Sequence, residues 1–411
     1  MKDRQVDAYE RARDFGAGLR VLLGSRMGSA YTTDLTTAGI RDLVDAALAS
    51  ARNTPPDSFH TIPERAAGPY PAVNILDPEV AALSGKAMID RALELEREAF
   101  AVDRRIKRIR KAEASFTASE TLILSSRGAV ASFSGTALSA SIEVVAEEAG
   151  EAQAGWEHDV RRFVQDLDIG SVGRRAAGKA LALLGARRID SVRAPVILDA
   201  AVAQDFLDMI RSGFSAENAQ KGKSLFAGKR DSMVASPLVS VHDDGLLERG
   251  IGTAPSDDEG TPLRAKTVID RGRFVQFLHN SYTARKEGTV STGNGMRGGF
   301  KATPGVGVTN LSIQPGTMGP EALIASTQRG LFVSEIMGAH MANPISGDFS
   351  VGASGYWIEN GSKAYPVREL TIAGNIIDLL KNVDAVCNDL RFAGRLGSPT
   401  LRIAEMSIAG K

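Results

Sequence analysis

Residues 343–375 have the sequence NPISGDFSVGASGYWIENGSKAYPVRELTIAGN. Apolar or small residues recur there at every second position, namely Phe349, Val351, Ala353, Gly355 and Trp357. This period of two predicts a half-buried strand. Asn360 and Gly361 follow it and favour a type I′ turn, in which both central residues adopt positive φ. We therefore expect a long β-hairpin, ending near Asn375, around which the C-terminal half is organised.

The composition is that of an ordinary globular protein with no dominant charge. Of the 411 residues, 43% are hydrophobic and 24% are charged, a length and composition that favour two domains. Lys plus Arg and Asp plus Glu each number 49, so no net field attracts nucleic acid. No apolar run approaches membrane-spanning length, and the first residues lack a signal-peptide core. The single cysteine, Cys387, excludes an internal disulfide. These features predict a soluble cytoplasmic protein.

Residues 1–190 are predicted to form an N-terminal domain of helices packed on a β-sheet. A hairpin is expected over residues 18–31, followed by a helix that opens at residues 34–36 and stops at residues 53–56. A second helix is expected from Asp77 and Pro78 to about residue 102. Sheet strands are predicted at residues 114–124, 129–133 and 137–146, with turns at 126–128 and 134–135, and a helix at 172–184.

Residues 191–411 are predicted to form a mostly antiparallel, barrel-like β domain with a few helices. A strand at residues 195–198 leads into a helix at 200–212. Further strands are expected at 238–242 and at 267–277, the latter folded at residues 270–272, and a helix at 321–329. The fold class is thus α+β with two domains, and a parallel, doubly wound sheet would contradict it.

The five histidines argue against a helical zinc site in this chain. They are His60, His158, His242, His279 and His340, and no two lie within a helical turn or two of each other. A helical zinc site needs two ligands on one face. Residues 156–159, WEHD, place possible ligands next to each other, but such neighbours point apart. We interpret that stretch as a solvated loop, and residues 242–245, HDDG, chiefly as a turn.

Two other stretches resemble binding motifs without their required context. Residues 293–298 match the spacing G-x-G-x-x-G, but Pro304 follows where a dinucleotide site needs a helix. The sequence leaves open another interpretation, in which a glycine loop lines a cleft and presents Asn294 and Arg297 to a ligand. The basic run at residues 104–111 has no aromatic platform, so a solvated face is favoured over nucleic-acid binding. No G-x-S-x-G nucleophile elbow occurs.

Four motifs in a fixed order carry a resemblance to a known family. They are KGKSLFAG at residues 221–228, DDEG at 257–260, TGNG at 292–295, and the long hairpin. With them the chain resembles the TldD/PmbA family, whose members have been called modulators of DNA gyrase, and within it the PmbA (TldE) branch. Family members usually begin some tens of residues further upstream. The resemblance therefore implies a truncated start or a lighter N-terminal domain, which would leave the 18–31 hairpin as an exposed sheet edge that a partner subunit covers.

The resemblance also bears on metal binding. TldD-type proteins carry a His-Glu-x-x-x-His zinc motif, which falls here on Leu207, Asp208 and Ser212, and residues 392–400 lack the C-terminal cysteine ligand. We therefore expect no metal and no catalytic residue in this chain, with zinc only in a TldD-type partner.

The family is implied to act as a heterodimeric metalloprotease on unfolded or small peptides. The first hypothesis is therefore a metal-free subunit of such a complex. The alternative is a stand-alone homodimeric peptide-binding or scaffold protein. An unaided hydrolase that uses Asp208 lacks a visible base–nucleophile pair.

Extended peptides are best held by strand addition, because main-chain hydrogen bonds tolerate any sequence. Asn294 and Arg297 in the glycine-rich loop, and Asn343 and Ser346 before the long hairpin, are the predicted peptide-binding residues. Arg297 is expected to be exposed. The alternative is that the Asn and Ser side chains only stabilise turns.

Overall fold

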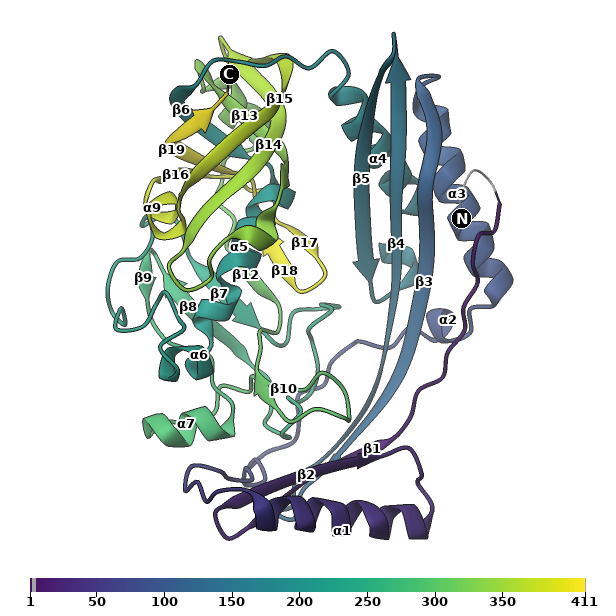
Figure 1. Ribbon diagram of the computed structural model, residues 1–411, viewed down its shortest axis with the longest axis vertical. Coiled ribbons are helices and arrows are strands. Elements are labelled where there is room, and N and C mark those ends of the chain that lie inside the picture. The colour runs from purple at the N-terminus through teal and green to yellow at the C-terminus, as the bar shows by residue number, and fades with distance from the viewer. Residues whose placement is uncertain (2–4, 411) are drawn as a thin grey trace.

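The computed structural model describes residue 1 and residues 5–410 of an α+β protein that is 24% helix and 37% strand. Figure 1 shows a layered N-terminal part beside a β-rich C-terminal part. The predicted fold class is confirmed. In the described residues no helix is long and apolar enough to cross a membrane.

The N-terminal part consists of a long antiparallel sheet and a separate helix-backed hairpin. Its elements are β1 (Ala17–Leu23), β2 (Arg26–Thr32), α1 (Thr37–Asn53), α2 (Pro78–Ala81), α3 (Gly85–Val102), β3 (Ile106–Leu124), β4 (Val130–Glu148), β5 (Glu151–Arg161), the 3-10 turn η1 (Val164–Asp166) and α4 (Ile169–Ala182). The sheet has the order β3-β4-β5, so β5 is an outer strand. The apolar faces of α3 and α4 cover it, with Leu95, Ile142 and Val172 in the shared core.

The predicted 18–31 hairpin is β1 paired with β2, and the glycine-rich loop of the C-terminal part lies against it. A Cβ built on Gly18 would lie 1.9 Å from the carbonyl oxygen of Phe300, so only glycine fits there. The rings of Tyr31 and Phe300 meet edge to face with centroids 6.3 Å apart. α1 covers β2, and the Thr36 hydroxyl caps its first turn by accepting from Gly39 N at 3.2 Å.

The C-terminal part contains more, shorter elements. They are β6 (Val192–Leu198), α5 (Ala200–Arg211), η2 (Ser212–Phe214), α6 (Ala216–Gln220), β7 (Val241–Asp244), β8 (Ala265–Asp270), β9 (Arg273–Phe274), α7 (Ser281–Glu287), β10 (Gly295–Met296), β11 (Gly305–Val306), β12 (Leu311–Ile313), α8 (Pro320–Ala325), β13 (Arg329–Met337), η3 (Ala339–Met341), β14 (Asp348–Glu359), β15 (Ser362–Asn375), α9 (Ile376–Lys381), β16 (Val383–Val386), β17 (Arg391–Ala393), β18 (Leu396–Ser398) and β19 (Leu401–Ala409).

Five of these strands close into a barrel. The order β15-β14-β13-β6-β19 is completed by pairing of β15 with β19, and only β13 and β6 run parallel. The predicted long hairpin is β14 with β15, and its turn has φ of 51° at Asn360 and 73° at Gly361. The five alternating residues that predicted this strand, Phe349, Val351, Ala353, Gly355 and Trp357, are all buried. A second sheet, β17-β18-β12-β7-β8-β9, lies beside the barrel.

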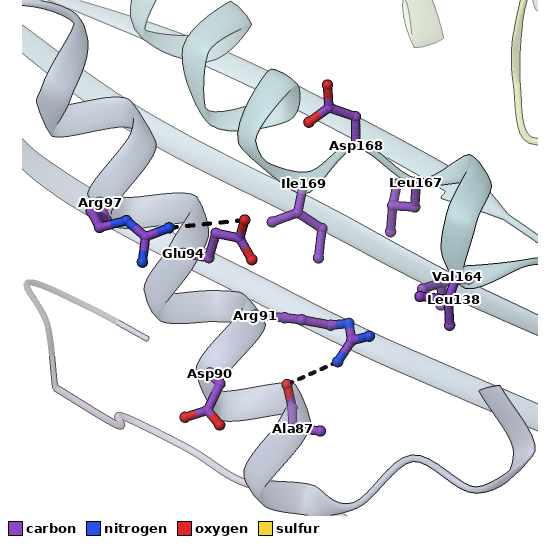
Figure 2. A pocket seen from close by; sticks show the side chains of 10 residues that line it. All are labelled: Ala87, Asp90, Arg91, Glu94, Arg97, Leu138, Val164, Leu167, Asp168 and Ile169. Carbon is purple, nitrogen blue, oxygen red and sulfur yellow. Dashed lines mark hydrogen bonds and ion pairs between the residues drawn. The ribbon is translucent and has the colours of Figure 1, made fainter. Parts of the chain in front are cut away.

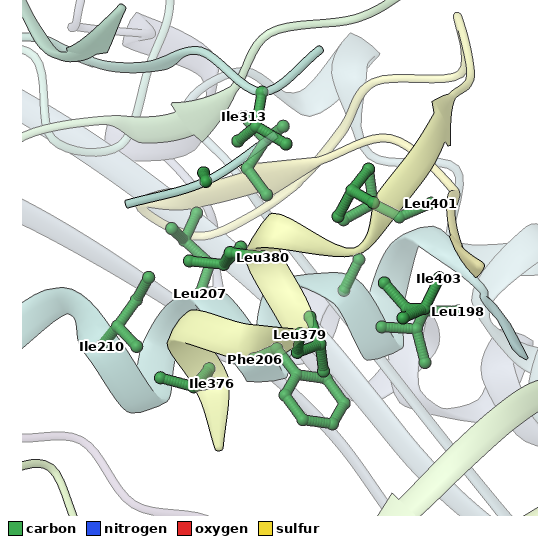
Figure 3. Close-up of a cluster of buried hydrophobic side chains, with 14 of the residues drawn as sticks. Leu198, Phe206, Leu207, Ile210, Ile313, Ile376, Leu379, Leu380, Leu401 and Ile403 are labelled. Atoms are coloured by element: carbon green, nitrogen blue, oxygen red, sulfur yellow. The ribbon is translucent and has the colours of Figure 1, made fainter. Parts of the chain in front are cut away.

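α5 joins the barrel to this second sheet through a continuous apolar core. Figure 3 shows Phe206, Leu207 and Ile210 of α5 among side chains from β6, β19 and α9. The rings of Phe206 and Phe349 meet edge to face with centroids 5.1 Å apart. This packing fixes which residues of α5 can face solvent.

Several local predictions were wrong. Residues 134–135 lie inside β4 because Gly135 allows Arg162 to approach its backbone, a Cβ there being 3.0 Å from Nη1. The helix from Asp77 is interrupted after Ala81 and restarts at a Ser84 cap. β3 begins eight residues before the predicted strand, and the predicted 321–329 helix ends at Ala325. By contrast, the basic run at 104–111 forms a solvated strand face as predicted, where Arg110 Nη1 contacts Glu143 Oε1 at 2.7 Å.

Candidate functional site

The three positions of α5 that match the zinc motif do not form a metal site. Leu207 is 2% exposed in the core. Asp208 faces solvent and contacts Arg211 Nε at 2.6 Å. Ser212 closes the helix, and its carbonyl oxygen accepts from Asn218 Nδ2 at 2.7 Å. Zinc requires converging imidazole, thiolate or carboxylate ligands, so these residues do not fit it. Across residues 1 and 5–410, no three His, Cys, Asp or Glu side chains are grouped to hold a metal ion.

A small pocket lies at the end of α5. Its volume is about 200 Å³, and it is lined by Arg211, Ser212, Ser215, Asn218, Leu278, Val306, Gly307 and Val308. The last three follow the glycine-rich loop in sequence. The pocket therefore brings a zinc-motif position next to the predicted peptide-binding loop.

Carboxylates gather on the solvent-facing side of α5, opposite α4. Removal from bulk water between the two parts of the chain, together with the neighbouring carboxylates of Asp208 and Glu335, raises the pKa of Asp205 to about 6, although its side chain keeps contact with solvent. The charge of Lys179 in α4 opposes this rise. Burial likewise raises the pKa of Glu335. This surface between α5 and α4 is thus acidic and close to a cation.

Asn294 lies beneath the glycine-rich loop in a fully buried network. Its side chain is 0% exposed. Its Nδ2 donates to Asp243 Oδ2 and to Gly307 O, both at 2.8 Å. Its Oδ1 accepts from Lys266 Nζ at 3.0 Å and from Thr292 Oγ1 at 2.7 Å. Asn294 therefore holds the loop in place from below and does not present its side chain to solvent.

The partners of Asn294 correct the interpretation of residues 242–245. Asp243 lies within β7, is 0% exposed, and contacts Lys266 Nζ at 3.0 Å. Its other oxygen accepts from Thr309 N at 2.6 Å. Sequence reasoning missed this pair because an Asp-Asp-Gly run resembles a turn. The alternation of Val241 and Asp243 along a strand would have been the signal for a buried carboxylate.

The acidic loop at residues 257–260 supports the glycine-rich loop from the other side. Asp257 accepts from Gly295 N at 2.8 Å, and Glu259 contacts Arg20 Nη1 of β1 at 2.9 Å. Ser281 Oγ donates to Glu259 at 2.6 Å. Burial, together with the charge of Glu259, raises the pKa of Asp257 to about 7, although three backbone N–H groups favour its ionised form. The motif thus joins three distant segments around one loop.

Arg297 is half-buried, so the expectation that it is exposed was wrong. Its Nη1 donates to Ala302 O at 3.2 Å, and its backbone N donates to Asp258 Oδ2 at 2.6 Å. These contacts with Ala302 and Asp258 hold Arg297 against the end of the loop, and this is why it is only partly exposed.

Asn343 and Ser346 lie in a separate, exposed turn. Asn343 Oδ1 accepts from Ile345 N at 2.9 Å, and Ser346 Oγ donates to Asp348 Oδ2 at 2.8 Å. Within the described chain no hydrogen bond or ion pair joins this turn to Asn294 or Arg297. Met337 and Met341 are exposed beside it, and η3 packs on α5. The turn therefore borders α5, with adaptable apolar side chains next to it.

Residues 156–159 form part of β5, so the prediction of a solvated loop was wrong. Glu157 is 3% exposed, and its carboxylate contacts Arg391 Nη2 of β17 at 2.8 Å and Lys179 Nζ at 3.2 Å. Although burial opposes ionisation, these cations together lower the pKa of Glu157. The network ties β5 and α4 to the second sheet of the C-terminal part.

Side chains cap three backbone groups along the outer edge of β5. His158 N donates to Glu157 Oε1 at 3.1 Å, and Val160 N donates to Asp159 Oδ1 at 2.8 Å. Trp156 O accepts from Lys179 Nζ at 3.1 Å. In an antiparallel pair, alternate residues turn their backbone groups away from the neighbouring strand. These three groups therefore have partners without a fourth strand.

A second pocket lies on the N-terminal part. Its volume is about 570 Å³. Figure 2 shows its lining side chains between α3 and the start of α4. Arg91 donates there to Ala87 O at 3.4 Å, and Arg97 contacts Glu94 at 3.9 Å. No predicted site residue lines this pocket.

Comparisons with known proteins cover nearly the whole chain. Residues 191–410, 78–184 and 1–51 match the C-terminal domain, the central domain and domain 1 of the PmbA/TldA metallopeptidases. The chain is 29% identical to the protein named metalloprotease PmbA of Escherichia coli O157:H7, over 99% of this chain and 88% of that one.

Two solved structures share the fold. One is a candidate modulator of a DNA gyrase from Thermotoga maritima, with a TM-score of 0.92 and 30% identity over 100% of this chain and 92% of that chain. The other is TldE from Thermococcus kodakarensis, with a TM-score of 0.86 and 26% identity over 95% and 89% of the two chains. Both similarities extend through the N-terminal and C-terminal parts.

Proposed function

The chain belongs to the PmbA/TldD metallopeptidase family, and on that basis we propose that it is the metal-free, TldE-type subunit of a TldD/TldE-like protease complex. In this proposal the zinc resides in a TldD-type partner, and the complex acts on unfolded or small peptides in the cytoplasm. When bound in that partner, the zinc supplies the activated water for peptide hydrolysis. This chain contributes the binding surface for the peptide.

The observation that supports the proposal is the chemistry of α5. Leu207 is part of the core, Asp208 is paired with Arg211, and Ser212 ends the helix. In this proposal, the three positions that hold zinc in TldD-type proteins are occupied here by a core leucine, a surface aspartate and a helix-ending serine. These residues suit the fold of α5 but do not form a zinc site. A chain of this kind assists catalysis only through a subunit that retains the ligands.

Peptide binding is assigned to the glycine-rich loop and its surroundings. Gly295 lies where a Cβ would be 2.7 Å from Glu259 Cγ, so the backbone runs close against its support. Asn294 is a positioning residue in this proposal, because its amide fixes the loop from below. Arg297 and the turn with Asn343 and Ser346 are the side chains that contact the peptide. The exposed Met337 and Met341 add adaptable apolar contact.

The experiment that tests the proposal is co-purification with the TldD-type protein of the same cell, followed by a peptide-cleavage assay. We expect a mixed complex that cleaves an unstructured peptide, while this chain alone does not. A partner whose zinc motif has been removed by substitution is the matched control, and its complex should form without cleaving.

Two results decide against the proposal. Cleavage by the complex with the substituted partner would place catalysis in this chain. A homodimer that never exchanges with the TldD-type protein, yet binds peptides, would instead support the stand-alone binding or scaffold function.

A further inference from the structure

We propose that Arg162 and Arg395 form a binding site for a peptide carboxylate at the junction of the two parts of the chain. The inference rests on the proposed peptide-binding function and adds a direction in which the peptide binds. A peptide would be oriented by its negatively charged end or by an acidic side chain.

Arg162 is surrounded by carbonyl groups. Its Nε donates to Gly250 O at 3.1 Å, and its Nη2 donates to Ile251 O at 2.7 Å and Thr253 O at 3.0 Å. Its Nη1 donates to Thr136 O at 3.2 Å. These bonds use four of the five N–H groups of a guanidinium. One N–H of Nη1 is left over, and no carboxylate of the described residues forms an ion pair with Arg162.

Arg395 brings a second cation to the same place. It lies in the exposed turn between β17 and β18, and in the described residues it too has no ion pair. A Cβ built on the preceding Gly394 would lie 3.7 Å from Val160 Cγ1, so the turn meets the end of β5 just before Arg162. Figure 1 shows the turn reaching from the C-terminal part toward the long sheet.

The electrostatic consequence is an uncompensated positive charge. Burial and, to a smaller extent, the charge of Arg395 together lower the pKa of Arg162 to about 10. Removing a cation from water without a counter-ion costs free energy, and a bound anion recovers part of that cost. A carboxylate fits best because the planar fork of an arginine can bind both of its oxygens.

No carboxylate of the described residues forms an ion pair with Arg395. Burial raises the pKa of Asp258, while the charges of Arg297 and Arg395 lower it, so Asp258 acts on Arg395 only from beyond ion-pair distance. Arg20 is already paired with Glu259. An anion that approaches Arg395 therefore displaces no carboxylate that is in direct contact with it.

The experiment measures binding of an unstructured peptide in two forms, one with a free C-terminal carboxylate and one with a C-terminal amide. The full chain is used, alone and in complex with a TldD-type partner whose zinc motif has been removed. We expect the free acid to bind about 10-fold tighter, which corresponds to about 1.4 kcal/mol, because only the acid offers a charged acceptor to the guanidinium. Arg395→Gln should remove this difference and leave the affinity for the amide unchanged.

Three controls test whether the effect is specific to Arg395, whether the carboxylate can come from a side chain, and whether charge alone is enough. Arg271→Gln changes an exposed arginine in the turn between β8 and β9 and should alter neither affinity. A second peptide pair with internal Glu or Gln and an amidated end tests side-chain carboxylates. Arg395→Lys should restore only part of the preference, because an ammonium lacks the fork.

Three outcomes would overturn the inference. The first is equal binding of every acid and amide pair by the unsubstituted chain. The second is an equal loss of affinity for the acid and amide peptides in Arg395→Gln, which would mean that Arg395 has a structural role. The third is no binding of any peptide, which also refutes the proposed function, whereas the first two leave that function intact.

Discussion

Replacing Asn294 with alanine should destabilise the C-terminal part by about 3–5 kcal/mol. The substitution removes two donated bonds, to Asp243 Oδ2 and Gly307 O, and two accepted bonds, from Lys266 Nζ and Thr292 Oγ1. A buried group that loses its partner costs about 1–3 kcal/mol, and bonds to charged groups lie at the upper end.

The geometry shows where this cost arises. Lys266 and Asp243 retain each other at 3.0 Å, and Thr292 Oγ1 still has His279 O at 3.1 Å, so part of the network survives. The Gly307 carbonyl loses its side-chain donor. Lys266 and Asp243 also each lose a hydrogen bond to the Asn294 amide, and the substitution leaves a cavity beside this buried ion pair.

Urea unfolding of the full chain measures this change. Asn53→Ala, at the exposed end of α1, is the matched control and should shift the free energy of unfolding by less than about 0.5 kcal/mol. Asn294→Asp should cost at least as much as Asn294→Ala, because it keeps the volume but places an acceptor beside Asp243 Oδ2 and Gly307 O. A loss below about 1 kcal/mol in Asn294→Ala would refute the network as the support of the loop.

Three further predictions concern the same region and the α5 helix. Arg297→Ala should weaken peptide capture by the complex while the chain stays folded, although the lost bond to Ala302 O lowers its stability slightly. Gly295→Val should weaken capture too, because its Cβ would meet Glu259 Cγ at 2.7 Å. Normal binding and cleavage by both variants would exclude the loop from the peptide-binding site. Asp257 has a folded-state pKa of about 7, above its usual 3.8, so the stability it contributes is complete below the lower value and is lost as the pH rises through the higher one. As the pH rises from 3.8 toward about 7, the unfolding free energy of the unsubstituted chain should therefore fall relative to that of Asp257→Asn; a constant difference between the two curves would contradict this. Elemental analysis of the purified chain should find no stoichiometric zinc, since Leu207 and Ser212 are not zinc ligands, and one tightly held zinc per chain would contradict the reasoning.

The elements that sequence predicted well are those whose signal is local. The β14–β15 hairpin combines a period of two with Asn360 and Gly361, and both features act within a few residues. The α1 helix was likewise predictable from its Thr36 cap. In these segments local preference and tertiary packing agree, so the prediction needed no knowledge of distant partners.

The errors arose where a distant partner decides the structure. Glu157 resembles a solvated residue until Arg391, 234 positions away, is placed beside it. Gly135 resembles a turn until Arg162 needs room against its backbone. Asn294 resembles a residue that faces a ligand, but its partners Lys266 and Asp243 lie 28 and 51 positions away and draw it inward. Charged and amide side chains can be buried only when such partners exist, and spacing along the chain does not reveal them.

The side-chain caps on the edge of β5 have a consequence for a protein that handles unfolded chains. An open strand edge acts as a template on which any extended polypeptide can assemble, and it invites aggregation. Here an incoming chain would first have to displace Glu157 from His158 N, Asp159 from Val160 N, and Lys179 from Trp156 O. Because Glu157 is also held by Arg391, that displacement would disturb the contact between the two parts. At these three positions, this edge of the long sheet is therefore protected from strand addition by unfolded chains.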